Sequence, residues 1–205
     1  MTPRLAIATA NAHKVKEITE ILSSLVPGFS LDDVLTLADF DAPSPVEDGV
    51  TFAHNALIKA RDLAALSGLP ALADDSGLAV DILGGSPGIF SARWSGRHGA
   101  DRENLTLLLH QLADVPDEHR GAQFVCAAAL VRPNGQETVE EGIVRGHLLR
   151  SPRGTGGFGY DPAFVPEGYE ITTAEMTAEE KNLISHRSRA LAAIAPQIAA
   201  ILTED

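Results

Sequence analysis

Two adjacent aspartates, Asp74 and Asp75, follow the apolar run "LPALA" and precede Ser76 and Gly77. Carboxylates can coordinate a cation or accept a proton from a reacting group. Successive side chains of a strand point to opposite faces, so one aspartate can face a site while the other forms a cap or an ion pair behind it. We expect Ser76 and Gly77 to end this strand and to let the backbone approach a ligand. A turn held by Asp and Ser hydrogen bonds is the alternative.

A second candidate site lies in "ATANAHK", residues 8–14, where a short strand turns into a helix. This turn presents the Thr9 hydroxyl, the Asn11 side chain and the free N–H groups of the helix start, and Lys14 falls in the first helical turn. Helix N-termini attract phosphate because their unpaired donors and the helix dipole point outward. The alternative is that Asn11 merely caps the helix.

The next helix carries Asn55 and Lys59, which share one face because they stand four residues apart. Glu47 and Asp48 precede this helix in a loop that could fold back onto it. Lys59 taken alone would be a solvated lysine on a helix.

A glycine-rich stretch, "SPRGTGGFGYDP", runs over residues 151–162 and contains the spelling G-x-G-x-x-G. A dinucleotide-binding turn needs a helix that opens at its last glycines. Here Asp161 precedes Pro162 and is biased away from helical angles, so the spelling does not predict such a turn. Glycines interleaved with Phe158 and Tyr160 favour a backbone that fits closely against a flat ligand, with Phe158 stacking on it.

The last group of polar residues lies in "EEKNLISHRSRA", residues 179–190. Lys181 falls in a short helix, and His186 and Arg187 fall at the start of the next one. Cations near a helix N-terminus oppose the helix dipole, which an anionic or acceptor-rich ligand would offset. Ordinary surface charge is the alternative.

The composition limits the partners of the chain. The net charge of −12 argues against binding to nucleic acid polymers, yet it permits a small phosphorylated ligand in a local positive pocket. Three of the four lysines fall in the stretches described above. The single cysteine, Cys126, excludes an internal disulfide and is expected to be a buried structural thiol. No run is long enough to span a membrane and the start lacks the apolar region of a signal peptide, so we expect a cytoplasmic protein without membrane contact.

The apolar patterns predict an α/β fold with a mixed sheet and helices on its faces, because strands and helices alternate early and hairpin strands come later. The 205 residues favour one domain over 1–205, divided into two lobes without a linker. Asp101 can cap one helix, Thr177 and Glu180 form a capping box for another, and Pro196 should bend or interrupt the last one. The expected strands are 4–9, 29–37, 69–75, 78–83, 121–131 and 137–144; the expected helices are 11–26, 51–67, 101–112, one after Thr177, and one through the C-terminal region.

Taken together and in this order, five stretches resemble the inosine triphosphatase family, also called Ham1-like. They are "TANAHK", "EDGVTFAHNALIKA", "ADDSGLAVDILGGSPGIFSARW", "GTGGFGYDP" and "EEKNLISHRSRA". The resemblance extends from residue 5 to about residue 200. One departure is His54, where the family usually has a glutamate.

The resemblance implies an elongated α/β fold with a deep cleft between two lobes, a homodimer, and Mg²⁺-dependent hydrolysis of ITP, dITP and XTP to the monophosphate and pyrophosphate. It makes Asp75 the proton acceptor and a magnesium ligand, with Glu47 near the metal and Ser76 touching the substrate. Asn55 and Lys59 match the family pattern as substrate-binding residues. The phosphates would contact Thr9, Ala10, Asn11, Ala12, His13 and Lys14. The base and sugar would contact Phe158, Gly159, Tyr160, Asp161, Lys181, His186 and Arg187.

Three other functions are alternatives to this one. A Maf-type pyrophosphatase would act on modified pyrimidine nucleotides instead. A nucleotide sensor would bind without turnover, which the joint presence of Asp75, Glu47 and Lys14 disfavours. A nicotinamide oxidoreductase is disfavoured by the context of the glycine-rich stretch.

Overall fold

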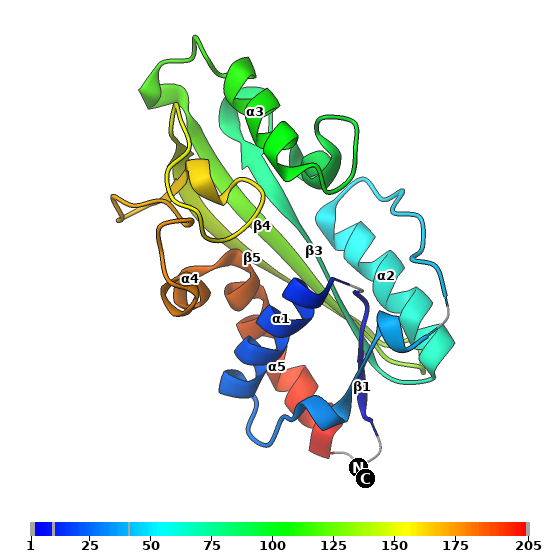
Figure 1. Ribbon diagram of the computed structural model, residues 1–205. Coiled ribbons are helices and arrows are strands. Elements are labelled where there is room, and N and C mark those ends of the chain that lie inside the picture. The colour runs from blue at the N-terminus through cyan, green and yellow to red at the C-terminus, as the bar shows by residue number, and fades with distance from the viewer. Residues whose placement is uncertain (1–2, 10, 41, 204–205) are drawn as a thin grey trace. The chain divides into compact units, whose positions relative to one another are not determined.

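The computed structural model describes residues 3–9, 11–40 and 42–203. Six strands within this part form one sheet in the order β2-β1-β3-β4-β5-β6 (Figure 1). β1 pairs in parallel with β2 and β3, whereas β5 and β6 are antiparallel. The predicted α/β class with a mixed sheet is therefore confirmed. The strands are β1 (Leu5–Ile7), β2 (Val34–Thr36), β3 (Ala71–Val80), β4 (Gly121–Val131), β5 (Glu137–Leu148) and β6 (Phe164–Pro166).

The helices begin and end close to the predicted residues, and they are α1 (Ala12–Leu25), α2 (Phe52–Ser67), α3 (Asp101–Gln111), α4 (Ala178–Ile184) and α5 (His186–Thr203). The Thr51 hydroxyl caps α2, and Gly68 ends it with a φ of 68°. The predicted capping box of Thr177 and Glu180 is present at α4. Of the two effects expected of Pro196, a bend or an interruption, the interruption is wrong, because α5 runs through this residue. Among the described helices, none has the length and apolar character that a membrane span requires.

The chain divides into two compact units, each built from several segments. The first unit contains residues 1–75, 126–142 and 187–205, and the second contains 76–125 and 143–186. Each of β3, β4 and β5 passes from one unit into the other. That these units are two lobes of a single domain, with a deep cleft between them, remains a prediction.

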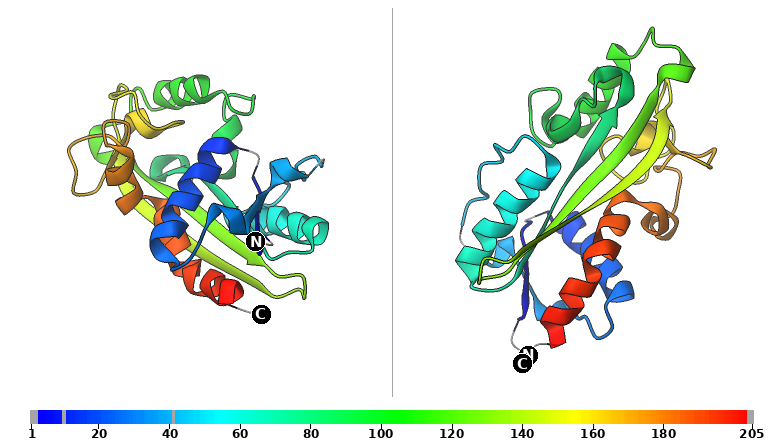
Figure 2. Two further views of the ribbon diagram at one scale, coloured as in Figure 1. Left: turned by 60° about the horizontal axis from the view of Figure 1, so that its bottom comes forward. Right: turned by 180° about the vertical axis from the view of Figure 1, so that it is seen from behind.

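In the first unit, helices cover both faces of the strands. α1 and α5 lie side by side on one face, and α2 lies on the other (Figures 1 and 2). The alternation of strand side chains explains this arrangement: Leu5 and Ile7 of β1 pack with α1 and α5, whereas Ala6 packs with α2. In β3, Leu72 belongs to the α1 and α5 side and Ala73 to the α2 side. Residues 74 and 75 continue this alternation.

The second unit has its own apolar core, in which Leu78 and Val80 of β3 pack with Leu105 and Leu108 of α3. A buried cation, Arg120, lies beside two residues of this core, Leu112 and Leu148. The Arg120 guanidinium donates to the carbonyl oxygens of Leu112, Leu148 and Leu149 at 2.6 to 2.8 Å. It thereby satisfies a carbonyl at the C-terminus of α3 and two carbonyls at the end of β5.

The expected break in β3 at Ser76 and Gly77 is wrong, because β3 is one strand over Ala71–Val80. Gly77 serves close packing rather than a turn. A Cβ atom at Gly77 would lie 2.4 Å from Ser91 Oγ and 2.6 Å from the Gly88 carbonyl oxygen. The Ser91 hydroxyl accepts a hydrogen bond from the Leu78 N–H at 2.9 Å in this narrow space.

Candidate active site

Asp75 lies on the α2 side of β3, where two side chains of that helix hold its carboxylate. Asn55 Nδ2 donates to Oδ2 at 3.2 Å and Lys59 Nζ donates to Oδ1 at 3.0 Å. Asn55 and Lys59 reach the same carboxylate because they stand one helical turn apart, as their spacing predicted. Asp75 and Asn55 are both buried.

The loop before α2 folds back onto the helix, as expected. The Gly49 N–H donates to Asn55 Oδ1 at 2.9 Å, and a Cβ atom at Gly49 would lie 2.5 Å from the same oxygen. Glycine is therefore required for this approach. The loop brings Glu47 Oε1 to 3.4 Å from Lys59 Nζ. One ammonium group thus faces two carboxylates, those of Glu47 and Asp75.

This pair of carboxylates fits a magnesium ion that also binds phosphate. Mg²⁺ usually takes one or two protein carboxylates and completes its shell with waters and substrate phosphates. The described residues contain no group of three or more His, Cys, Asp or Glu that could hold a metal by themselves. Glu47 and Asp75 exceed the charge of Lys59 by one, so the cluster retains a negative charge for a cation.

Burial and charge shift the protonation of this cluster. Burial raises the pKa of Asp75 above its usual value, and the neighbouring Glu47 carboxylate adds to the rise while Lys59 opposes it. Burial alone would lower the pKa of Lys59, but the attraction of Asp75, Asp74 and Glu47 raises it overall. Lys59 therefore stays protonated and positively charged beside Asp75.

Asp74 lies on the opposite side of β3, as the alternation predicted. Its carboxylate receives Lys14 Nζ of α1 at 3.2 and 3.3 Å, and Arg187 of α5 at 3.0 and 3.2 Å. Arg187 also donates through Nη1 to Glu17 Oε2 at 2.7 Å. Burial would raise the pKa of Asp74, but Lys14 and Arg187 lower it well below its usual value. Asp74 therefore remains a buried anion among cations.

Two contacts between backbone N–H groups and side-chain oxygens lie in the turn before α1. The Asn11 N–H donates to Thr9 Oγ1 at 3.1 Å, and the Lys14 N–H reaches Asn11 Oδ1 at 3.5 Å. This contact agrees with a capping role for Asn11, and a role in phosphate binding stays a prediction. Ala10 lies outside the described residues, and only the backbone is described at Ala12 and His13.

In the second unit, Asp161 organises the glycine-rich stretch. Its Oδ2 accepts from the Phe158 N–H at 2.8 Å and from Lys181 Nζ at 2.5 Å, and its Oδ1 accepts from Thr173 Oγ1 at 2.8 Å. Lys181 Nζ also lies 4.9 Å from the centre of the Phe158 ring. The ring itself is 47% exposed, so one face of it can receive a flat ligand.

Backbone contacts fix the rest of this stretch. The Gly156 N–H donates to the Ala174 carbonyl at 2.9 Å, and a Cβ atom at Gly157 would lie 2.1 Å from Asp161 Oδ2. Gly159 donates to Asp101 Oδ2 at 3.1 Å. Asp101 was expected to cap α3; instead Ala100 is the N-cap and Asp101 is the first helical residue, holding the glycine-rich stretch. The α-helix that a dinucleotide-binding turn needs does not open at Gly159, in agreement with the prediction. A short 3₁₀ helix over Asp161–Ala163 follows instead, and Asp161 lies in it although a residue before proline is biased away from helical angles.

Tyr160 and His186 complete this group. The Tyr160 hydroxyl donates to the Ser91 carbonyl at 2.9 Å, so it is used inside the fold. The His186 ring stacks on Phe124 with 4.9 Å between ring centres. His186, Lys181 and Asp161 line one small hollow. Ser76 follows Asp75 directly in β3 and is partly exposed.

The predicted residues thus form two clusters, one in each unit. The first cluster contains Glu47, Asn55, Lys59 and Asp75, together with Lys14 and Arg187, which both form ion pairs with Asp74. The second cluster contains Phe158, Asp161, Lys181 and His186. That both serve one site remains a prediction. The contacts of Glu17, Thr173 and Asp101 are not predictable from the sequence, because single charged or hydroxyl residues on helices and loops have no distinctive spacing.

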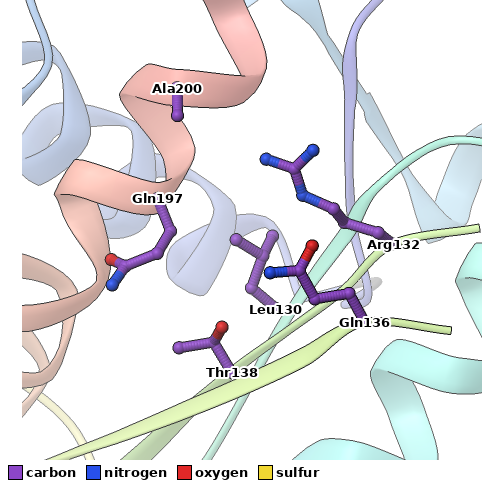
Figure 3. Close-up of a pocket in the computed structure, with 6 residues that line it drawn as sticks. All are labelled: Leu130, Arg132, Gln136, Thr138, Gln197 and Ala200. Carbon is purple, nitrogen blue, oxygen red and sulfur yellow. The ribbon is translucent and has the colours of Figure 1, made fainter. Parts of the chain in front are cut away.

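A separate hollow of about 210 Å³ lies between β4, β5 and α5 in the first unit (Figure 3). Its lining consists of Leu130, Arg132, Gln136, Thr138, Gln197 and Ala200. None of the predicted site residues that the structure describes contributes to this lining, so the hollow is distinct from both clusters.

Known proteins resemble the chain over nearly its whole length. The model of the Ham1 family matches residues 5–197. The dITP/XTP pyrophosphatase of Streptomyces avermitilis is 57% identical over 199 residues, which are 97% of this chain and 98% of that protein. A crystal structure described as a nucleoside-triphosphatase, dITP/XTP pyrophosphatase, from Mycobacterium abscessus is 50% identical with a TM-score of 0.78, covering 96% of this chain and 100% of the other. The Ham1 protein of Staphylococcus aureus is 33% identical with a TM-score of 0.84, covering 96% and 98%.

Proposed function

Because the chain belongs to the Ham1 family, we propose that it hydrolyses non-standard purine nucleoside triphosphates, namely dITP, XTP and ITP, to the monophosphate and pyrophosphate. Relatives named dITP/XTP pyrophosphatases support this substrate class. In this reaction water attacks the α-phosphorus, the bond between that atom and the bridging oxygen to the β-phosphorus breaks, and the water loses one proton.

The observation that carries the proposal is the position of the Asp75 carboxylate between Asn55 and Lys59. Two donors fix the carboxylate, so it can accept the proton of the attacking water with little reorganisation. General base catalysis of this kind contributes about 10²–10⁴ to the rate.

Glu47 and Asp75 would hold Mg²⁺, since both carboxylates face the same lysine ammonium. When bound, this ion would neutralise charge on the phosphates. Lys59 supplies a fixed positive charge beside the same carboxylates. Lys14 and the N–H groups at the start of α1 would contact the other phosphates. Their combined charge opposes the build-up of negative charge on the leaving pyrophosphate.

The second cluster would hold the base. Phe158 offers its exposed ring face for stacking, and Lys181 and His186 supply donors near it. Hypoxanthine and xanthine have a carbonyl at the purine 6-position, whereas adenine has an amino donor there. Hydrogen-bond donors of the protein would face the amino donor of adenine and leave both groups unpaired. A mismatch of this kind can lower kcat/KM for the analogue by a factor of about 10⁴.

Product analysis tests this function directly. Purified protein incubated with dITP and Mg²⁺ should release dIMP and pyrophosphate; dIDP and orthophosphate would refute the proposal. Preference for methylated dUTP or dTTP over dITP would indicate the Maf-type activity. Binding without any product in a single-turnover assay would indicate a nucleotide sensor.

Replacing Asp75 by asparagine should lower kcat at least about a hundredfold because the proton acceptor is removed. Asp62→Asn is the matched control, since Asp62 is an exposed residue of α2. Circular dichroism should show both variants folded. Near-normal turnover of folded D75N would remove Asp75 from the mechanism.

The resemblance also supports a homodimer with a cytoplasmic location. Size-exclusion chromatography with light scattering should give a mass near twice the 21.6 kDa of one chain. A monomer at micromolar concentration would contradict the dimer.

A further inference from the structure

Glu17 lies in α1, one helical turn after Lys14, and contacts the first turn of α5. The two helices lie side by side (Figure 1), and Glu17 Oε2 accepts from Arg187 Nη1 at 2.7 Å. The Arg187 side chain is 1% exposed and that of Glu17 is 14% exposed. This charge-assisted contact is therefore shielded from solvent, where ion pairs are least screened.

The other oxygen of Glu17 shows that this position is costly. Oε1 is buried and has no hydrogen-bond partner within the described ranges. Burying a carboxylate oxygen without a hydrogen bond disfavours the folded state, and each such case needs an explanation. The contact with Arg187 supplies one.

The geometry at Asp74 shows what this contact achieves. Arg187 Nε and Nη2 both donate to the same oxygen, Oδ2, instead of spanning the two carboxylate oxygens. Lys14 Nζ contacts both Oδ1 and Oδ2, at 3.3 and 3.2 Å. A guanidinium usually prefers the arrangement in which it binds both oxygens of a carboxylate. Glu17 accepts from Nη1, whereas Asp74 accepts from Nε and Nη2, so the contact with Glu17 opposes a rotation of the guanidinium toward Oδ1, where Lys14 Nζ also donates.

We propose that Glu17 is a positioning residue: by holding Arg187 it keeps the Asp74 carboxylate available to Lys14 and so fixes this lysine for phosphate. The inference rests on the proposed function in that it takes Lys14 to be a phosphate contact. Glu17 touches neither substrate nor metal in this scheme. It acts through Arg187 and Asp74.

The test is Glu17→Gln, which keeps the size of the side chain but removes the charge that holds the guanidinium. We expect KM for dITP to rise at least tenfold, with kcat changed less than threefold. The affinity for inorganic pyrophosphate, measured by titration calorimetry, should fall by a similar factor. Glu20→Gln is the matched control, because Glu20 lies on the same helix, is 49% exposed and only pairs with Lys16 at 3.7 Å. It should leave all these values unchanged.

A double-mutant cycle with Lys14→Met separates positioning from general damage to the fold. If Glu17 acts through Lys14, Glu17→Gln should weaken pyrophosphate binding less than twofold in the Lys14→Met background. Unchanged KM and pyrophosphate affinity in folded E17Q would overturn the inference, and so would effects that simply multiply in the double mutant. If E17Q does not fold, Glu17→Asp takes its place, because its shorter side chain reaches less far toward Arg187. This variant should also raise KM for dITP and weaken pyrophosphate binding, by smaller factors than those expected of E17Q.

Failure of the proposed function would look different. A wild-type protein that releases no pyrophosphate from dITP would refute the function, while the calorimetric comparison of wild type, E17Q and K14M would still decide the role of Glu17.

Discussion

Replacing Asn55 by aspartate tests the amide that connects the loop before α2 with Asp75. Asn55 is fully buried; its Oδ1 accepts from the Gly49 N–H at 2.9 Å and its Nδ2 donates to Asp75 Oδ2 at 3.2 Å. The Asn55→Asp change keeps the size and the acceptor for Gly49. It replaces the donor by a carboxylate oxygen that faces Asp75, so an attraction becomes a repulsion.

The magnitude follows from the distance. Two unit charges about 3.2 Å apart repel by about 5 kcal/mol at an effective dielectric constant of about 20. Protonating one carboxyl avoids this repulsion, but it costs about 6 kcal/mol at pH 8 and about 1.5 kcal/mol at pH 5 for a group with an ordinary pKa of about 3.9. The free energy of unfolding should therefore fall by about 5 kcal/mol at pH 8 and by about 1.5 kcal/mol at pH 5.

The sign is fixed by the folded state. The repulsion raises the pKa of the new carboxyl in the folded protein above its unfolded value, so stability is retained below about pH 4 and is lost as the pH rises. Urea unfolding of wild type and N55D at pH 5 and pH 8, with EDTA to remove bridging metal ions, measures this difference.

Asn134→Asp is the matched control for this experiment. Asn134 lies in the exposed turn between β4 and β5, where its Oδ1 accepts from the Gln136 N–H at 3.0 Å and a carboxylate can do the same. Its stability should change by less than about 0.5 kcal/mol at either pH. If N55D is as stable as wild type at pH 8, or loses the same amount at both pH values, Asn55 does not donate to Asp75 and the described site is wrong.

Three further substitutions and reactions test other parts of the structure. Gly77→Ala places a Cβ atom 2.4 Å from Ser91 Oγ and should lower the free energy of unfolding, measured by urea unfolding, by about 1–3 kcal/mol. A decrease of less than about 0.5 kcal/mol would contradict the close packing. Arg120→Met leaves three carbonyl oxygens without this donor and should cost at least about 3 kcal/mol, so an unchanged melting temperature would refute its role. Burial raises the pKa of the Cys126 thiol to about 12, so a thiol reagent at pH 8 should label it only after unfolding.

The sequence predicted much of the fold because strong local signals agree with the tertiary structure. Thr51 is the N-cap of α2 and Gly68 is its C-cap, at the positions that the capping rules predict. Pro133, Asn134 and Gly135 form the turn between β4 and β5, as their sequence predicts. The error at Gly77 has a physical reason: a glycine after Asp-Asp-Ser resembles a turn, and only the position of Ser91 shows that it permits close packing within a continuous strand.

The candidate site was predictable in its residue types and less so in their partners. Spacing placed Asn55 and Lys59 on one helix face, but the loop contact that brings Glu47 to Lys59 depends on Gly49, six residues before Asn55, where a side chain would not fit. Glu17 resembles any charged residue of an amphipathic helix. Its role becomes visible only when α5 brings Arg187 beside it, because no local pattern encodes that contact.

The different environments of the Asp74 and Asp75 carboxylates follow from strand geometry together with helix packing. Alternation requires that the two carboxylates leave β3 on opposite sides. The sequence alone does not say which helix covers which side, and this decides the chemistry. The face of Leu72 receives α1 and α5, which supply two cations, so Asp74 becomes a permanently charged structural anion. The face of Ala73 receives α2, which supplies one cation and one amide for two carboxylates, so Asp75 retains unneutralised charge and can accept a cation or a proton.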